Sequence, residues 1–132
     1  MQDELDDSLR FETLAAALNL GASQQKELVE SLAQMISLSL PDSVTITRGG
    51  WFLSKDKPIE ELTIRFDDYH YRIVKERASY TAKALKIVRG VALKTTELEL
   101  EACFNEIINE LTALAAKNDK AKDALQKFVS GL

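Results

Sequence analysis

The chain has 132 residues, of which 45% are hydrophobic and 29% charged, with a formal net charge of −4 at pH 7. This composition excludes a disordered protein and fits one globular domain over residues 1–132 with a single core. No apolar run reaches the roughly 20 residues of a membrane span, the N-terminus is acidic, and the one cysteine cannot form an intrachain disulfide. We therefore expect a soluble cytoplasmic protein that does not bind membranes.

The charge is distributed unevenly along the chain. Residues 43–94 carry 11 Lys and Arg against 6 Asp and Glu, whereas residues 1–42 carry 2 against 8 and residues 95–132 carry 4 against 7. A basic segment between two acidic ones favours acidic partners or self-association, because charge acts on association more than on the fold.

Residues 9–40 are predicted to form helices, after a frayed acidic start at 1–8. Apolar residues from Leu9 to Leu18 indicate a short helix that ends at Gly21. Ser23 is the expected N-cap of a second helix, which Pro41 closes. Its apolar stripe has helical spacing and consists of Leu28, Leu32, Met35, Ile36 and Leu40.

From Ser43 the hydrophobic period changes to two, which is typical of β-strands. The first strand should end at Gly49-Gly50. Trp51-Phe52-Leu53 then forms either a short strand or a folded-back loop.

Residues 59–66 and 69–76 are predicted to form a β-hairpin around the turn Asp67-Asp68. In this register apolar side chains face each other in every central pair, and a slip of one residue would expose two tyrosines and a phenylalanine. The other face is expected to be exposed to solvent and basic, and we call it the wet face; it carries Thr63, Arg65, His70 and Arg72.

The segment 79–94 is compatible with a helix or a strand. We favour a strand with a bulge at Gly90, because Ile87-Val88 and Val91 are β-branched. Thr96 and Glu99 match a capping box, which predicts that a long helix begins there. Its apolar stripe runs from Leu100 to Ala115, and a last helix follows Asn118-Asp119, so residues 96–130 are predicted to be helical.

The order of these elements predicts an α+β domain with two layers. About four antiparallel strands in residues 43–94 form the sheet, and the N-terminal and C-terminal helices pack on one of its faces.

The segment Val88–Leu98, together with Leu40-Pro41 and Trp51-Phe52-Leu53, resembles a family of small bacterial proteins of unassigned function. The resemblance implies a bacterial cytoplasmic origin and no activity, cofactor or site residue. The order of elements is also similar to that of dimeric nucleoid-associated proteins and secretion chaperones, which is a likeness of fold alone.

Catalytic groups are sparse, and we expect no catalytic residue, metal site or cofactor. His70 lies on the wet face without an orienting carboxylate, while Cys103 falls in the apolar stripe of the long helix. The carboxylates of that helix are spread around it, and no phosphate-binding glycine motif or nucleophile elbow occurs.

The strongest functional signal is the loop Arg48–Lys57, in which a glycine turn is flanked by basic and aromatic residues. Gly-Gly lets a backbone approach an anion closely, and Trp stacks on bases. The alternative is that the aromatics cover the edge of the core. With the wet sheet face, the predicted binding residues are Arg48, Trp51, Lys55, Lys57, Arg65, His70 and Arg72.

These observations favour a non-enzymatic protein-interaction module, self-associating or adaptor-like, with no small-molecule ligand. The alternative is a nucleic-acid-binding protein that uses the basic sheet face, extended by Lys83, Lys86 and Arg89. The sequence pI of about 5.1 argues against that alternative. An enzyme with an unrecognised site ranks last.

Overall fold

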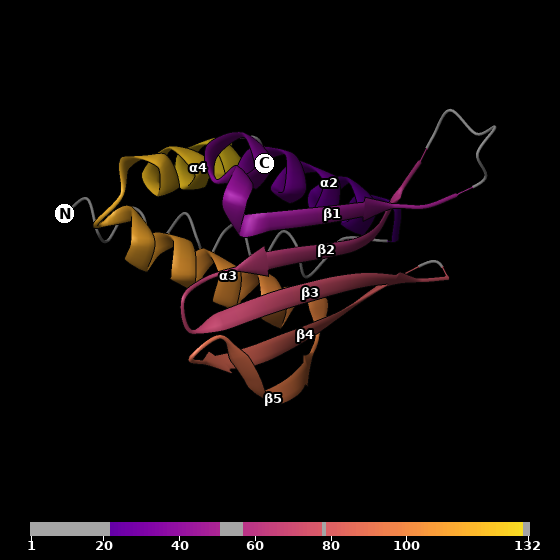
Figure 1. Ribbon diagram of the computed structural model, residues 1–132. Helices are drawn as coiled ribbons and strands as arrows, with labels where there is room; N and C mark the ends of the chain where they lie inside the picture. Colours follow the sequence, from indigo (N-terminus) through magenta and orange to yellow (C-terminus); the bar gives the residue numbers. More distant parts are fainter. Residues whose placement is uncertain (1–21, 51–56, 78, 131–132) are drawn as a thin grey trace.

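A computed structural model describes residues 22–50, 57–77 and 79–130 of the chain (Figure 1). The helix expected between Leu9 and Leu18 and the expected strand or loop at Trp51-Phe52-Leu53 lie outside the described residues. Within the described part, no helix has the length and apolar character needed to cross a membrane.

Among the described residues, five strands form one antiparallel sheet, and their spatial order β1-β2-β3-β4-β5 follows the chain. The predicted α+β class is confirmed, and the described sheet has five strands where about four were expected. The elements are α2 (Ala22–Ser39), the 3-10 turn η1 (Pro41–Ser43), β1 (Val44–Arg48), β2 (Ile59–Arg65), β3 (Tyr69–Glu76), β4 (Ser79–Val88), β5 (Val91–Leu98), α3 (Leu100–Ala115) and α4 (Asp119–Ser130).

The predicted β2–β3 hairpin is confirmed in its register. Leu62 lies opposite Ile73 and Ile64 opposite Tyr71, and the Phe66 N–H donates to the Tyr69 carbonyl at 2.8 Å across the Asp67-Asp68 turn. The hydrophobic pattern supports this register, because a slip of one residue would move the apolar set to the exposed face.

The segment 79–94 is a hairpin, which corrects the single strand with a bulge at Gly90. Arg89 and Gly90 have φ values of 53° and 79° and form the two-residue turn between Val88 and Val91. Two successive positive φ angles suit a tight hairpin because they match the twist of the strands. The irregularity lies further along: Ile87 is opposite Ala92 and Lys86 is opposite Lys94, which leaves Leu93 as an extra residue in β5.

Both predicted helix caps are also corrected. Thr96 lies inside β5 opposite Ala84, and α3 is preceded by Glu99, whose side chain makes no capping hydrogen bond. The pairing of β5 with β4 includes Thr96, so this residue is not available as the N-cap of α3. Helix α2 begins at Ala22, so Ser23 lies within it; Ala is the stronger helix former.

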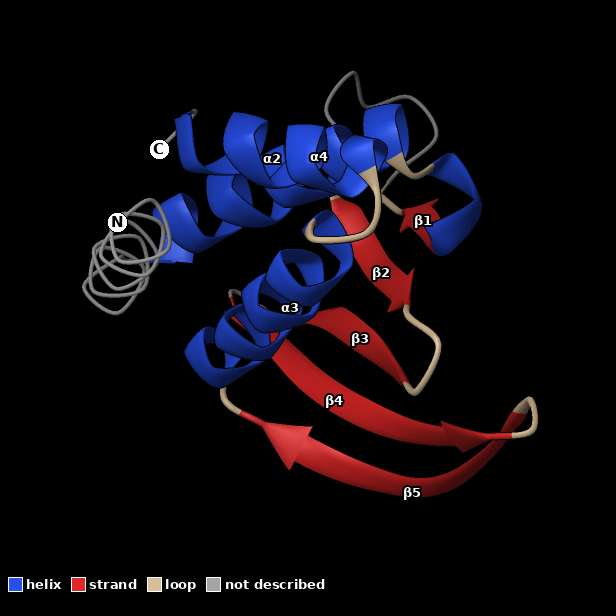
Figure 2. Ribbon diagram, turned by 90° about the vertical axis from the view of Figure 1, so that its left-hand side faces the viewer, coloured by secondary structure: helices blue, strands red, loops and turns tan. Residues whose placement is uncertain are grey.

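The core lies between the sheet and the helices. Helix α3 contacts β3, β4 and β5, helix α2 contacts β1, β2 and β4, and α4 packs against α2 and α3 (Figure 2). Leu32 of α2, Ile107 of α3 and Ile73 of β3 are each fully buried, which makes one continuous core.

Candidate functional site

The outer face of the sheet carries Arg65, His70 and Arg72, as predicted, but its arginines are engaged within the chain. Arg65 donates to Thr45 Oγ1 at 2.6 Å, and Arg72 Nε lies 2.8 Å from a Glu61 carboxylate oxygen. These contacts occupy donors that a phosphate would otherwise need.

Arg48 anchors a strand to a helix. Its guanidinium donates to both carboxylate oxygens of Glu30 in α2, at 2.9 and 3.0 Å, and to the Lys57 carbonyl at 3.0 Å. A bidentate arginine–carboxylate pair fixes geometry, so this residue connects β1, α2 and the start of β2. Lys57 is exposed, and the predicted binding residues Trp51 and Lys55 lie outside the described residues.

The side chains considered for catalysis have unreactive surroundings. Burial, followed by the Arg65 charge, lowers the pKa of His70. Cys103 is fully buried, and burial raises the pKa of its thiol to about 12, so the thiol is protonated at neutral pH. The described residues contain no group of three His, Cys, Asp or Glu side chains arranged to hold a metal ion.

A hollow of about 300 Å³ lies between α2, β4 and the start of α3. Its titratable residues are Tyr80, Glu99 and Glu101, and the Tyr80 hydroxyl donates to the Ile59 carbonyl at 3.3 Å. Burial is the main cause that raises the pKa of Tyr80. Ser79 and Thr81 also line the hollow, and their hydroxyls donate to backbone carbonyls, of Glu76 at 3.4 Å and of Val74 at 3.5 Å.

The most open part of the described sheet is β5. It pairs with β4 on one side, and no described strand pairs with its other side. Seven of its eight residues are exposed, and only Leu98 is half-buried. An edge strand presents a row of unpaired N–H and C=O groups, so this edge is able to hydrogen-bond another extended chain.

Apolar side chains cluster at the tip of the β4–β5 hairpin. Val88, Val91 and Leu93 are 39%, 58% and 65% exposed, and among the described large hydrophobic residues that are exposed only Leu38 lies elsewhere. Figure 2 shows why: the hairpin extends past the helices, so α3 covers its base and not its tip. A cluster of exposed apolar side chains marks a candidate interaction site.

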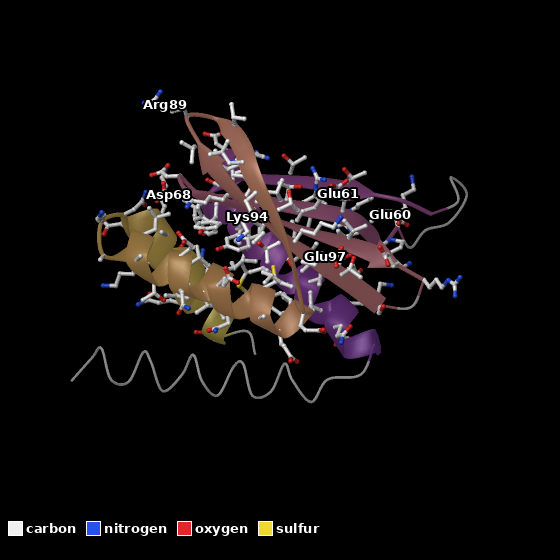
Figure 3. The ribbon with its side chains drawn as sticks, turned by 90° about the horizontal axis from the view of Figure 1, so that it is seen from below. Glu60, Glu61, Asp68, Arg89, Lys94 and Glu97 are labelled. Atoms are coloured by element: carbon white, nitrogen blue, oxygen red, sulfur yellow. The ribbon has the colours of Figure 1, made fainter. Side chains whose placement is uncertain are left out.

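Basic side chains accompany this cluster. Lys83, Lys86, Arg89 and Lys94 are exposed residues of the hairpin, and Glu97 is its one acidic residue, so the segment 79–98 has a formal charge of +3 in a protein of charge −4. Figure 3 shows Arg89 at the turn, Lys94 midway along β5 and Glu97 near the start of α3. This part of the sequence-predicted basic region lies on an open edge of the described sheet.

Sequence reasoning missed the open edge because it joined β4 and β5 into one strand. A signal for the hairpin was present: Arg89-Gly90 separates the β-branched residues Val88 and Val91, and β-branched residues occur again at Thr95 and Thr96.

A comparison of the chain with models of protein families, with curated proteins and with solved structures found no match.

Proposed function

We propose that this protein is a non-enzymatic interaction module that binds proteins by adding an extended segment to the free edge of β5. The observation that carries the proposal is the exposure of that strand along seven of its eight residues. In such complexes main-chain hydrogen bonds supply affinity, and alternate side chains supply specificity.

The apolar tip adds a hydrophobic contribution. Burying a leucine side chain completely stabilises by about 1.5–3 kcal/mol, and Leu93, 65% exposed, still has most of that gain to make on binding. Val91, 58% exposed, lies on the same edge strand. A bound segment that reaches the turn would cover both.

Two features make the edge selective. The extra residue Leu93 interrupts regular pairing, and Lys94 places a charge on the strand. Natural proteins use bulges and lysines to prevent indiscriminate edge-to-edge pairing. The regular stretch for pairing is therefore Lys94–Leu98, and the partner must satisfy the lysine.

We propose no catalytic activity, because His70 and Cys103, the side chains considered for catalysis, have unreactive surroundings. The nucleic-acid alternative has weaker support, because Arg65 and Arg72 already make contacts within the sheet face. Self-association through β5 is one form of the proposed function, and light scattering of the intact chain distinguishes a second copy from a different partner.

The test is a selection of peptides from a displayed random library against the protein, immobilised at low density so that copies do not meet. We expect enrichment of peptides that bind the wild type and fail to bind a folded β5-edge variant. Thr95→Pro and Thr96→Pro provide that variant, because adjacent residues of a strand point their N–H groups to opposite edges. One of the two substitutions removes a backbone N–H that points away from the sheet, and the other removes a backbone N–H that points toward β4.

Circular dichroism and melting identify the proline variant that keeps the wild-type fold. Leu93→Gln, which replaces an exposed apolar side chain with an uncharged polar one, serves as a second edge variant whichever proline variant folds. Enriched peptides that bind every folded edge variant as tightly as the wild type would refute the proposal, as would a library that yields no binder.

A further inference from the structure

We infer that the segment captured by β5 is acidic: an extended stretch of another protein in which carboxylates alternate with apolar side chains. The inference rests on the proposed function and specifies the chemistry of the partner. It follows from the side chains that the β4–β5 hairpin brings to one face.

The bulge at Leu93 decides which side chains share that face. Lys86 lies directly opposite Lys94, the next pair is Ile87 with Ala92, and Val88 then lies opposite Val91. Because successive pairs alternate between the two faces, the lysine pair and the valine pair share one face. Without the extra residue, Val91 and Lys94 would point to opposite sides.

This face is the one that carries the core further along the hairpin. Ala82 and Ala84 precede Lys86 at alternate positions of β4, and both are buried. Helices α2 and α3 both contact β4, whereas the hairpin continues past α3 (Figure 2). The tip therefore presents an uncovered continuation of the core face, with two valines and two lysines.

The lysine pair lacks a counter-charge. Like charges directly opposite each other in a sheet are destabilising, and neither Lys86 nor Lys94 forms an ion pair with any described residue. Asp68 lies beside this end of β4, where its carbonyl accepts from the Ile87 N–H at 2.9 Å, and its carboxylate forms no ion pair with either lysine. A carboxylate from outside, seated opposite Lys94, would relieve this repulsion.

The open edge selects a peptide over a nucleic acid. An extended peptide matches the alternating N–H and C=O groups of β5, which a phosphate backbone does not. Single-stranded nucleic acids are bound through stacking on aromatic side chains. The hairpin 79–98 has one aromatic residue, Tyr80, and it is buried. Tyr69, which lies opposite Lys86 on β3, is half-buried and already stacks with Tyr71 at a centroid distance of 6.2 Å.

A synthetic peptide probes this directly. In the sequence Glu-Thr-Val-Thr-Glu-Thr-Val-Thr-Glu-Thr, glutamate and valine alternate along one face of a strand and threonine occupies the other. The control peptide has lysine in place of each glutamate. Fluorescence anisotropy with the intact chain should show binding of the acidic peptide that weakens as salt is raised from 50 to 300 mM, because exposed charges are screened.

Two variants with the same change in net charge separate the lysine pair from general attraction. Lys86→Gln with Lys94→Gln should weaken binding of the acidic peptide about ten-fold, which corresponds to about 1.4 kcal/mol. Lys117→Gln with Lys120→Gln, which neutralises two exposed lysines near the start of α4, should leave binding unchanged.

The inference is overturned if both double variants bind alike, if the lysine peptide binds as well as the acidic one, or if only a single-stranded oligonucleotide binds. A chain that forms a dimer through β5 and excludes the peptide would also overturn it. If the library peptides need an intact β5 edge for binding but contain no acidic residue, the inference of an acidic partner is wrong and the proposed function remains supported. A library with no edge-dependent binder would reject the proposed function itself.

Discussion

Two leucines on strands of the same sheet differ in burial, and truncating each one tests the assignment of core and open edge. Leu62 on β2 is fully buried between Ile46 and Ile73 on the neighbouring strands, whereas Leu93 on β5 is 65% exposed. The substitutions Leu62→Ala and Leu93→Ala remove the same atoms. Any difference between their effects therefore reports on the environment.

The expected magnitudes follow from burial. Three carbon groups at about 0.8 kcal/mol each give about 2.4 kcal/mol for Leu62, and the cavity left behind brings the cost to about 3–4 kcal/mol. Leu93 is 65% exposed in the folded chain, so roughly a third of the same transfer energy, about 0.8 kcal/mol, is at stake. The first change should lower Tm by about 10–15 °C and the second by about 2–4 °C.

Urea unfolding followed by circular dichroism gives the free energies, and thermal melting provides a second measurement. Equal losses for the two variants would mean that Leu93 is covered in solution, and the open-edge assignment would then be wrong. A loss below 1 kcal/mol for Leu62→Ala would contradict the packing of the core.

Two further predictions concern protons. Burial, followed by the charge of Asp68, raises the pKa of Glu110, so the ionised carboxylate is less stable in the folded chain than in the unfolded chain at neutral pH. Glu110→Gln should therefore raise Tm at pH 7, and this gain should disappear as the pH falls through the raised pKa toward the ordinary value of 4.5; a lower Tm at pH 7 would refute the assignment. The lowered pKa of His70 has the opposite effect on the pH dependence: its contribution to stability is complete above pH 6.5 and is lost as the pH falls, because burial and then the Arg65 charge oppose protonation in the folded chain. Melting of His70→Gln between pH 7.5 and 5.5 should thus depend less on pH than melting of the wild type, and parallel curves would contradict this.

Tyr71 illustrates how one buried residue serves the core and the polar surface together. Its ring packs edge-on against Phe66 at a centroid distance of 6.0 Å and stacks with Tyr69 at 6.2 Å. Its hydroxyl donates to Glu106 of α3 at 3.3 Å, and burial followed by the Glu106 charge raises its pKa. The contact joins β3 to α3 at a position where the sheet is fully covered, in contrast to the tip of β5.

Local patterns predicted the β2–β3 hairpin and the long helix α3 well. The pairing of Ile64 with Tyr71 followed from alternation alone, because a slipped register would expose the apolar residues. The buried stripe of α3, which includes Phe104 and Ile108, followed from helical spacing. The sequence-based boundaries were wrong at Gly90 and at Thr96. At Gly90 a bulge was predicted and the structure has a turn, and at Thr96 a helix cap was predicted and the structure has a strand. Short sequence signals of this kind fit either structure.

The sequence by itself determined the α+β class, the basic character of the middle segment and the faces of its central hairpin, because alternation and charge are local properties. The tertiary structure alone decided which basic residues remain open. Arg48 and Arg65 reach partners 18 and 20 residues away in the chain, and no short pattern contains such pairs. It also placed β5 at the edge of the sheet, where the hairpin tip extends past α3. The register of β4 and β5 brings Lys86 opposite Lys94.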